Sequence, residues 1–389
     1  MTSTRQNVLR WGVGAAVAGA AGVAGVAVGQ LVRRDRTARP EGEDVDYVET
    51  PDEERVVIAD DGVPLHVEID HPRGDSPRRT TVVLTHGYTL NLTGWVFQRR
   101  ALREAGYRVV LWDHRGHGRS EEGEDSSYDI AQLGRDLGSV IGAAAPEGPV
   151  VLAGHSMGGM TIMAFAEQHP EVLRERVIGT ALLSTSAGEL RNVHWGLGQH
   201  VAAVVHRLGP AAMTRLSDQQ ALVAQALKAG KEVEELAVHH FSFGSHVPQS
   251  IIRLTADMIF ATRLHVIGQF LPTLMEHHRF DGLAAFDGIE TLIMNGTEDR
   301  LTPPAHSEAI VAAVPGAEHV VVADGGHVLM LEHPDVVNDQ LLDLLHRAER
   351  ALERPAKRRT TRVRRTVTEL AGRRRGASPS GRAKGRAGV

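Results

Sequence analysis

Short apolar runs and stretches of helical period alternate through the middle of the chain. Residues 54–70 predict a hairpin that turns at Asp60-Asp61-Gly62. Further apolar runs predict buried strands at 80–85, 108–113, 149–153, 177–183, 290–295 and 318–323. Helical periods occur at 95–105, 128–144, 157–168, 305–313 and 328–353. A hairpin followed by this alternation predicts a mostly parallel, doubly wound sheet with helices on both faces.

The alternation stops between residues 186 and 287. This stretch has helical patterns, such as 218–227 and 250–264, and no strand pattern. Its helical faces carry apolar side chains, among them Phe270, Leu271 and Met275. We therefore expect a helical cap over 186–287 that walls an apolar pocket. The cap would be inserted into a core made of 41–185 and 288–353, just before the strand at 290–295.

Charge separates the two ends of the chain from its body. The 389 residues have a net charge of −5, but 41–353 hold 24 basic and 46 acidic residues, whereas both ends are basic. Residues 11–32 carry no charge and are long enough to cross a bilayer, which predicts a membrane anchor within 1–40. A cleaved secretory signal peptide is the alternative, and it would place the protein outside the cell.

The basic segment 354–389 lacks apolar periodicity, so we expect a disordered tail. It could bind anionic lipid beside the anchor, or it could serve only as a solubilising extension. Nucleic acid is a poor candidate partner, because no aromatic residue interrupts the basic run and the acidic body repels phosphate. The chain has no cysteine, which excludes disulfides and a cysteine nucleophile.

One serine stands between glycines at the end of an apolar run. The sequence Gly154-His155-Ser156-Met157-Gly158 follows the strand predicted at 149–153, and helical period resumes directly after it. Ligand sites in parallel α/β sheets lie beyond the carboxyl ends of strands. A tight strand-to-helix turn at that edge would expose the Ser156 hydroxyl, with small residues required on both sides. Ser156 is therefore a candidate nucleophile.

A serine hydroxyl is a weak nucleophile unless a base accepts its proton and a carboxylate orients that base. Asp299 lies in the loop after the strand at 290–295, and His327 lies in the loop after the strand at 318–323. Both positions are carboxyl ends of predicted strands, as is that of Ser156. The three residues thus form a candidate Ser-His-Asp triad. The neighbouring Glu298 is an alternative acid.

These features together resemble the α/β-hydrolase family over most of residues 54–350. Besides the serine turn and the order Ser, Asp, His, the stretches LTHGY (84–88) and WDHRGHGRS (112–120) match the family. The resemblance implies that the backbone N–H groups of Tyr88 and Met157 form an oxyanion hole. It also favours Asp299 over Glu298, through the spacing from Gly296 to Pro303. Serine at the nucleophile position excludes the epoxide hydrolases and dehalogenases of this fold, which use aspartate there.

The predicted function is a serine hydrolase that cleaves carboxylic esters through an acyl-enzyme, and we expect its substrates to be apolar or lipid-like. No metal or organic cofactor is implied, and the histidines of the cap lack the spacing of a zinc motif. A cofactor-free haloperoxidase, a peracid-forming enzyme or an acyltransferase could use the same triad. A non-catalytic, membrane-tethered binding protein on this scaffold is the alternative from another class.

Overall fold

The computed structural model describes residues 47–74, 78–193, 231–353 and 362–365. The apolar span 11–32, the helix expected at 218–227 and most of the basic tail lie outside the described residues. Within the described ranges, no helix has both the length and the apolar character needed to cross a membrane.

A nine-stranded sheet, with strand order β1-β2-β4-β3-β5-β6-β7-β8-β9, organises the described chain. β1 pairs antiparallel with β2, and β2 pairs antiparallel with β4; all later neighbours are parallel. Every apolar run predicted as a strand forms one. The strands are β1 (Glu53–Ile58), β2 (Pro64–Asp70), β3 (Thr81–Thr85), β4 (Arg108–Trp112), β5 (Val150–His155), β6 (Val177–Leu183), β7 (Glu290–Gly296), β8 (Glu318–Val322) and β9 (Arg362–Arg365).

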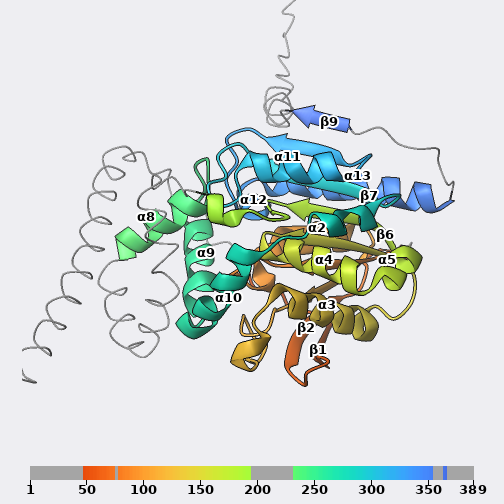
Figure 1. The fold of residues 1–389 in the computed structure, drawn as a ribbon, viewed down its shortest axis with the longest axis horizontal. Helices are drawn as coiled ribbons and strands as arrows, with labels where there is room; N and C mark the ends of the chain where they lie inside the picture. The colour runs from red at the N-terminus through yellow and green to blue at the C-terminus, as the bar shows by residue number, and fades with distance from the viewer. Residues whose placement is uncertain (1–46, 75–77, 194–230, 354–361, 366–389) are drawn as a thin grey trace, which may run out of the picture.

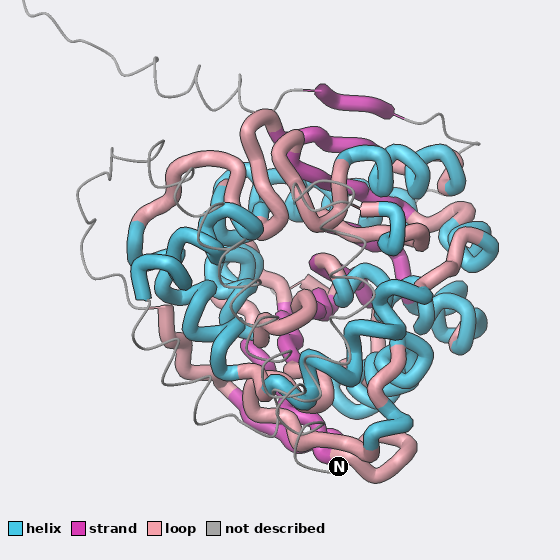
Figure 2. Tube along the Cα trace, turned by 60° about the vertical axis from the view of Figure 1, so that its left-hand side comes forward, coloured by secondary structure: helices cyan, strands magenta, loops and turns pink. Residues whose placement is uncertain are grey.

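Helices cover both faces of the sheet (Figures 1 and 2). Alternate side chains of a strand point to opposite faces, so Val82 and Leu84 join one apolar cluster and Val83 joins the other. The first cluster includes side chains of α2 (Val96–Glu104) and α13 (Pro334–Glu353). The second includes side chains of α3 (Ile130–Ala144), α4 (Met157–Gln168), α5 (Pro170–Arg176) and α11 (Pro304–Ala313). The predicted doubly wound sheet is confirmed.

Helices also fill the described part of the insertion between β6 and β7. They are α8 (Lys231–Ser242), α9 (Gln249–Ala261) and α10 (Leu264–Glu276), which gather at one side of the sheet (Figure 1). The short helices η3 (Leu190–Asn192) and η4 (Asp281–Phe286) flank them. Val266, Phe270 and Leu274 of α10 pack against Met160 of α4 and Leu190, which seats this helical unit on the core.

Prolines account for two differences from the predicted helices. The stretch 328–353 forms two helices, α12 (Leu329–Glu332) and α13, with the break at Pro334. Proline has no N–H and clashes with the preceding turn, so it begins a helix but does not continue one. In the same way Pro170 ends α4 and begins α5, a helix that periodicity did not predict.

The structure also differs from the disorder expected throughout 354–389. Residues Arg362–Arg365 form β9, which pairs in parallel with β8 from Glu318 to Val321. Without β9, β8 would be the edge of the sheet, with a row of unpaired backbone groups available to a further strand. Apolar periodicity could not reveal this strand, because backbone hydrogen bonds require no particular side-chain pattern.

Candidate active site

Ser156 occupies a strained turn between β5 and α4. Its backbone has φ 52° and ψ −118°, a conformation that L-residues rarely adopt, and its N–H donates to the Leu183 carbonyl at 2.9 Å. The flanking glycines are required by close packing. A methyl group on Gly158 would lie 2.2 Å from the Thr85 carbonyl oxygen, and one on Gly154 would lie 2.5 Å from the Gly158 backbone. Together these constraints hold the hydroxyl at the carboxyl end of the sheet.

A continuous chain of hydrogen bonds joins the three residues of the predicted triad. Ser156 Oγ lies 3.0 Å from His327 Nε2, and His327 Nδ1 lies 3.0 Å from each carboxylate oxygen of Asp299. An ionised carboxylate only accepts, so Nδ1 carries the imidazole proton. Nε2 is then unprotonated and can accept the proton of Ser156. The structure thus brings together all three predicted side chains.

Asp299 is buried among donors that stabilise its charge. One carboxylate oxygen accepts from the backbone N–H groups of Leu301 at 2.9 Å and Thr302 at 2.8 Å, and the other accepts from the Thr302 hydroxyl at 2.8 Å. Burial favours the neutral acid, but the His327 imidazole and the hydrogen bonds from His327 and Thr302 outweigh it and lower the pKa of Asp299. Asp299 is therefore ionised at neutral pH. No motif in the sequence distinguishes Thr302.

Glu298, the alternative acid, is directed elsewhere. Its side chain is 48% exposed, and a carboxylate oxygen lies 3.8 Å from an Arg300 nitrogen. Its backbone N–H donates to the Gly325 carbonyl at 2.9 Å, which fixes its loop beside the histidine loop. Between the two adjacent acids, it is Asp299 that contacts His327.

The two N–H groups expected in the oxyanion hole are available. Among the described residues, neither the Tyr88 nor the Met157 backbone N–H has a hydrogen-bond acceptor. Met157 is the first residue of α4, where a helix presents free N–H groups and positive potential. Two hydrogen bonds fix the position of Tyr88, one made by the neighbouring residue Thr89 and one by its own side chain. The Thr89 N–H donates to His117 Nε2 at 3.2 Å, and the Tyr88 hydroxyl donates to the Ile267 carbonyl of α10.

The backbone around His327 is clamped on both sides. The His327 carbonyl accepts from His155 Nε2 at 2.9 Å, and the Val328 N–H donates to the Ser242 carbonyl at 2.9 Å. Burial, with a contribution from His327, lowers the pKa of His155 to about 3, so His155 is neutral. The His155 side chain and the Ser242 backbone carbonyl therefore fix the position of the loop that contains His327.

The Glu332 carboxylate links the same loop to the helical insertion through hydrogen bonds. Its buried carboxylate accepts from the Gly326 N–H at 2.6 Å, directly before His327. The other carboxylate oxygen accepts from the backbone N–H groups of Gly244 at 2.9 Å and Ser245 at 2.5 Å. Glu332 was not identified from the sequence, because it lies in a stretch predicted as a plain helix.

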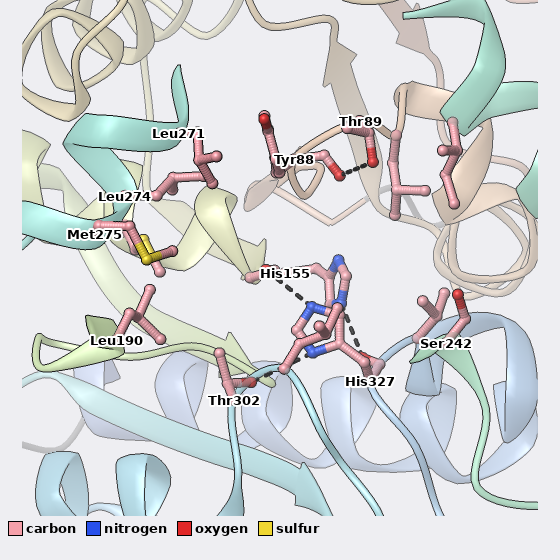
Figure 3. Close-up of a pocket in the computed structure, with 16 residues that line it drawn as sticks. Tyr88, Thr89, His155, Leu190, Ser242, Leu271, Leu274, Met275, Thr302 and His327 are labelled. Atoms are coloured by element: carbon pink, nitrogen blue, oxygen red, sulfur yellow. Dashed lines mark hydrogen bonds between the residues drawn. The ribbon is translucent and has the colours of Figure 1, made fainter. Parts of the chain in front are cut away.

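An apolar cavity of about 190 Å³ adjoins Ser156 and His327. Figure 3 shows that apolar side chains from η3 and α10 group to one side of the imidazole. Because they belong to the insertion and its border, the expected apolar wall exists among the described residues. These side chains are Leu190, Leu271, Leu274 and Met275.

One carboxylate cluster in the described ranges has the spacing of a cation site. Carboxylate oxygens of Asp60, Asp61 and Asp136 lie within 4.8 Å of one another. The Arg115 guanidinium already bridges this cluster, donating to Asp61 at 2.6 Å and to Asp136 at 2.7 Å. Arg115 therefore offsets part of the negative charge of the cluster, and these bonds stabilise the turn that contains Arg115.

Comparisons with known proteins agree with this architecture. The model of the alpha/beta hydrolase fold family matches residues 80–334. A monoacylglycerol lipase of Mycolicibacterium smegmatis is 26% identical over 268 residues, which cover 67% of this chain and 85% of that protein. An esterase structure from Exiguobacterium antarcticum aligns with TM-score 0.60 and 22% identity, over 76% of this chain and all of that one. A bromoperoxidase structure from Bacillus anthracis aligns over the same shares with TM-score 0.61 and 22% identity. The chain belongs to the α/β hydrolase fold family.

Proposed function

We propose that the protein is a serine hydrolase that cleaves carboxylic esters with an apolar acyl group. The observation that carries this proposal is the hydrogen-bonded chain from Ser156 through His327 to Asp299 at the wall of an apolar cavity. A poised hydroxyl, an oriented imidazole and two free N–H groups are the parts that acyl transfer requires.

The reaction follows from the positions of these groups. Ser156 Oγ bonds to the acyl carbon while its proton passes to His327 Nε2. The carbonyl oxygen gains negative charge, which the N–H groups of Tyr88 and Met157 stabilise. The bond between the acyl carbon and the alcohol oxygen then breaks, and Nε2 returns its proton to the leaving alcohol. Water attacks the acyl-Ser156 ester in the same way and releases the acid and the free serine hydroxyl.

The cavity lining supports an apolar acyl chain. Leu190, Leu271, Leu274 and Met275 offer no charge to bind a polar acyl group, and burying each methylene contributes about 0.8 kcal/mol to binding. The relative named as a monoacylglycerol lipase supports an ester rather than an amide as substrate. The bromoperoxidase structure has the same fold at 22% identity, so the experiment below also measures peracid formation.

The proposal is tested with p-nitrophenyl esters of increasing acyl length, from acetyl to octanoyl, and with the matched anilides. We expect kcat/KM to rise with chain length until the cavity is filled, and the esters to be cleaved much faster than the anilides. Perhydrolysis is measured in parallel with acetate and hydrogen peroxide. Faster cleavage of anilides, or perhydrolysis without ester hydrolysis, would overturn the proposal.

We also propose that residues 11–32 attach the enzyme to a membrane. An uncharged helix of this length spans about 33 Å, against a hydrocarbon core of about 30 Å. We expect the full chain to sediment with membranes, to resist extraction by high salt and to retain residues 1–40 by mass spectrometry. A mature chain that begins after residue 30 and stays in the supernatant would identify a signal peptide instead.

A further inference from the structure

One hydroxyl in the wall of the cavity has no hydrogen-bond partner in the part of the chain that the structure describes. The other polar side chains that line it are engaged within the protein: the Tyr88 hydroxyl with Ile267, the Thr89 hydroxyl with the Tyr88 carbonyl, and the Thr302 hydroxyl with Asp299. Ser242 lines the same cavity and is only 5% exposed, yet its Oγ contacts no donor or acceptor among the described residues. The oxygen is accessible from the cavity, so a polar group of a bound ligand can form a hydrogen bond with it.

The orientation of Ser242 is unusual for a helix. Buried hydroxyl residues in helices commonly donate to the carbonyl four residues earlier. Thr161 does so to Met157 at 2.9 Å, and Thr255 does so to Ile251 at 2.8 Å. Ser242, in the last turn of α8, makes no such bond and faces the cavity instead.

Ser242 lies across His327 from the apolar group that we assign to the acyl chain. Its carbonyl accepts from Val328, the residue after His327, so it is adjacent to the catalytic imidazole. In Figure 3 the apolar side chains Leu271, Leu274 and Met275 lie on one side of His327, and Ser242 lies on the other. His327 Nε2 must reach the alcohol oxygen to protonate it, so the alcohol part of the ester lies beside the imidazole. The acyl chain then extends toward the apolar group.

We propose that Ser242 binds a free hydroxyl on the alcohol part of the substrate, so that the preferred substrates are monoesters of short polyols. This inference rests on the proposed ester hydrolysis at Ser156 and specifies its substrate class. A hydroxyl both donates and accepts, as Ser242 does, so either orientation of the pair satisfies the buried group. Leu90, Ile259 and Val328 also line the cavity and are apolar, and an alkyl alcohol would form no hydrogen bond with Ser242.

The experiment compares nearly isosteric esters that differ by a methyl or a hydroxyl group. Propyl and 2-hydroxyethyl butanoate form one pair, and butyl and 3-hydroxypropyl butanoate form a second pair of longer reach. Loss of one neutral hydrogen bond changes an equilibrium by about three- to tenfold. For Ser242→Ala we therefore expect kcat/KM to fall about three- to tenfold for at least one hydroxyalkyl ester. The variant keeps the backbone carbonyl that accepts from Val328, so the readout is the ratio of kcat/KM for the hydroxyalkyl ester to that for the alkyl ester of the same pair, and this ratio should fall by that factor.

The control variant is Ser139→Ala, which removes a hydroxyl of α3 that bonds back to the Arg135 carbonyl at 3.3 Å. It should leave both substrate ratios unchanged. Equal losses for the alkyl and hydroxyalkyl esters in Ser242→Ala, or no change in either ratio, would overturn the role of Ser242 and leave the ester hydrolysis intact. If the wild-type chain hydrolyses none of the esters, it is the proposed function that fails.

Discussion

Replacing Ser156 with alanine should lower ester turnover by about 10⁴ to 10⁶ and abolish labelling by a fluorophosphonate. The reason is chemical, because the hydroxyl forms the bond to the acyl carbon and no other hydroxyl is bonded to His327 Nε2 among the described residues. Asp299, His327 and the oxyanion N–H groups would remain in place, which leaves a small residual rate. The measurements are initial rates on p-nitrophenyl butanoate and the fraction of protein labelled, determined by intact mass.

The fold should survive this change. Ser156 contributes one side-chain hydrogen bond, and the turn is fixed by its own N–H, by Leu183 and by the flanking glycines. We expect thermal unfolding of Ser156→Ala to resemble that of the wild type. Ser126→Ala, at an exposed serine far along the chain from the turn, serves as the control and should keep full activity and labelling. Wild-type turnover by Ser156→Ala would show that another group is the nucleophile.

The sequence was sufficient to predict the sheet and to place three candidate residues at one edge of it, because both depend on local patterns. Uniform apolar runs marked the buried parallel strands, and their carboxyl ends located Ser156, Asp299 and His327 at one edge. The glycines at 154 and 158 mattered because any side chain there would meet backbone atoms. These constraints act over a few residues, so they are visible in one sequence.

Other parts of the site depend on contacts between distant segments. Glu332 accepts from Gly244 and Ser245 across 88 and 87 positions of sequence, and the Ser242 carbonyl accepts from Val328 across a similar separation. Thr89 meets His117, whose pKa burial lowers to about 4, so that it stays neutral and accepts the Thr89 N–H. Nothing in the local pattern of these residues distinguishes them from ordinary helix or loop positions. Their roles follow from how the helical insertion and the loops pack together.

Replacing Asp299 with asparagine should reduce kcat by about four orders of magnitude, the size of effect known for the acid of a Ser-His-Asp triad. Asp299 accepts from His327 Nδ1, two backbone N–H groups and the Thr302 hydroxyl. An amide has one acceptor oxygen, so its NH₂ group must face at least one of these donors. If it faces His327, the imidazole changes tautomer and Nε2 becomes protonated. It could then no longer accept the Ser156 proton, and the imidazolium formed in the reaction would lose its counter-charge.

Glu298→Gln is the matched control, since it makes the same chemical change one residue away. The Glu298 side chain is 48% exposed and interacts with Arg300 at 3.8 Å, so its loss should change kcat by less than about twofold. The two variants are compared by pre-steady-state acylation, because the acid acts on proton transfer and not on binding; KM should change little in either. A larger loss in Glu298→Gln than in Asp299→Asn would assign the acid to Glu298. If kcat fell only slightly and equally in both variants, no carboxylate would be needed to orient the imidazole. The hydrogen bonds of His155 and Glu332 to the loop that contains His327 would then suffice to hold it.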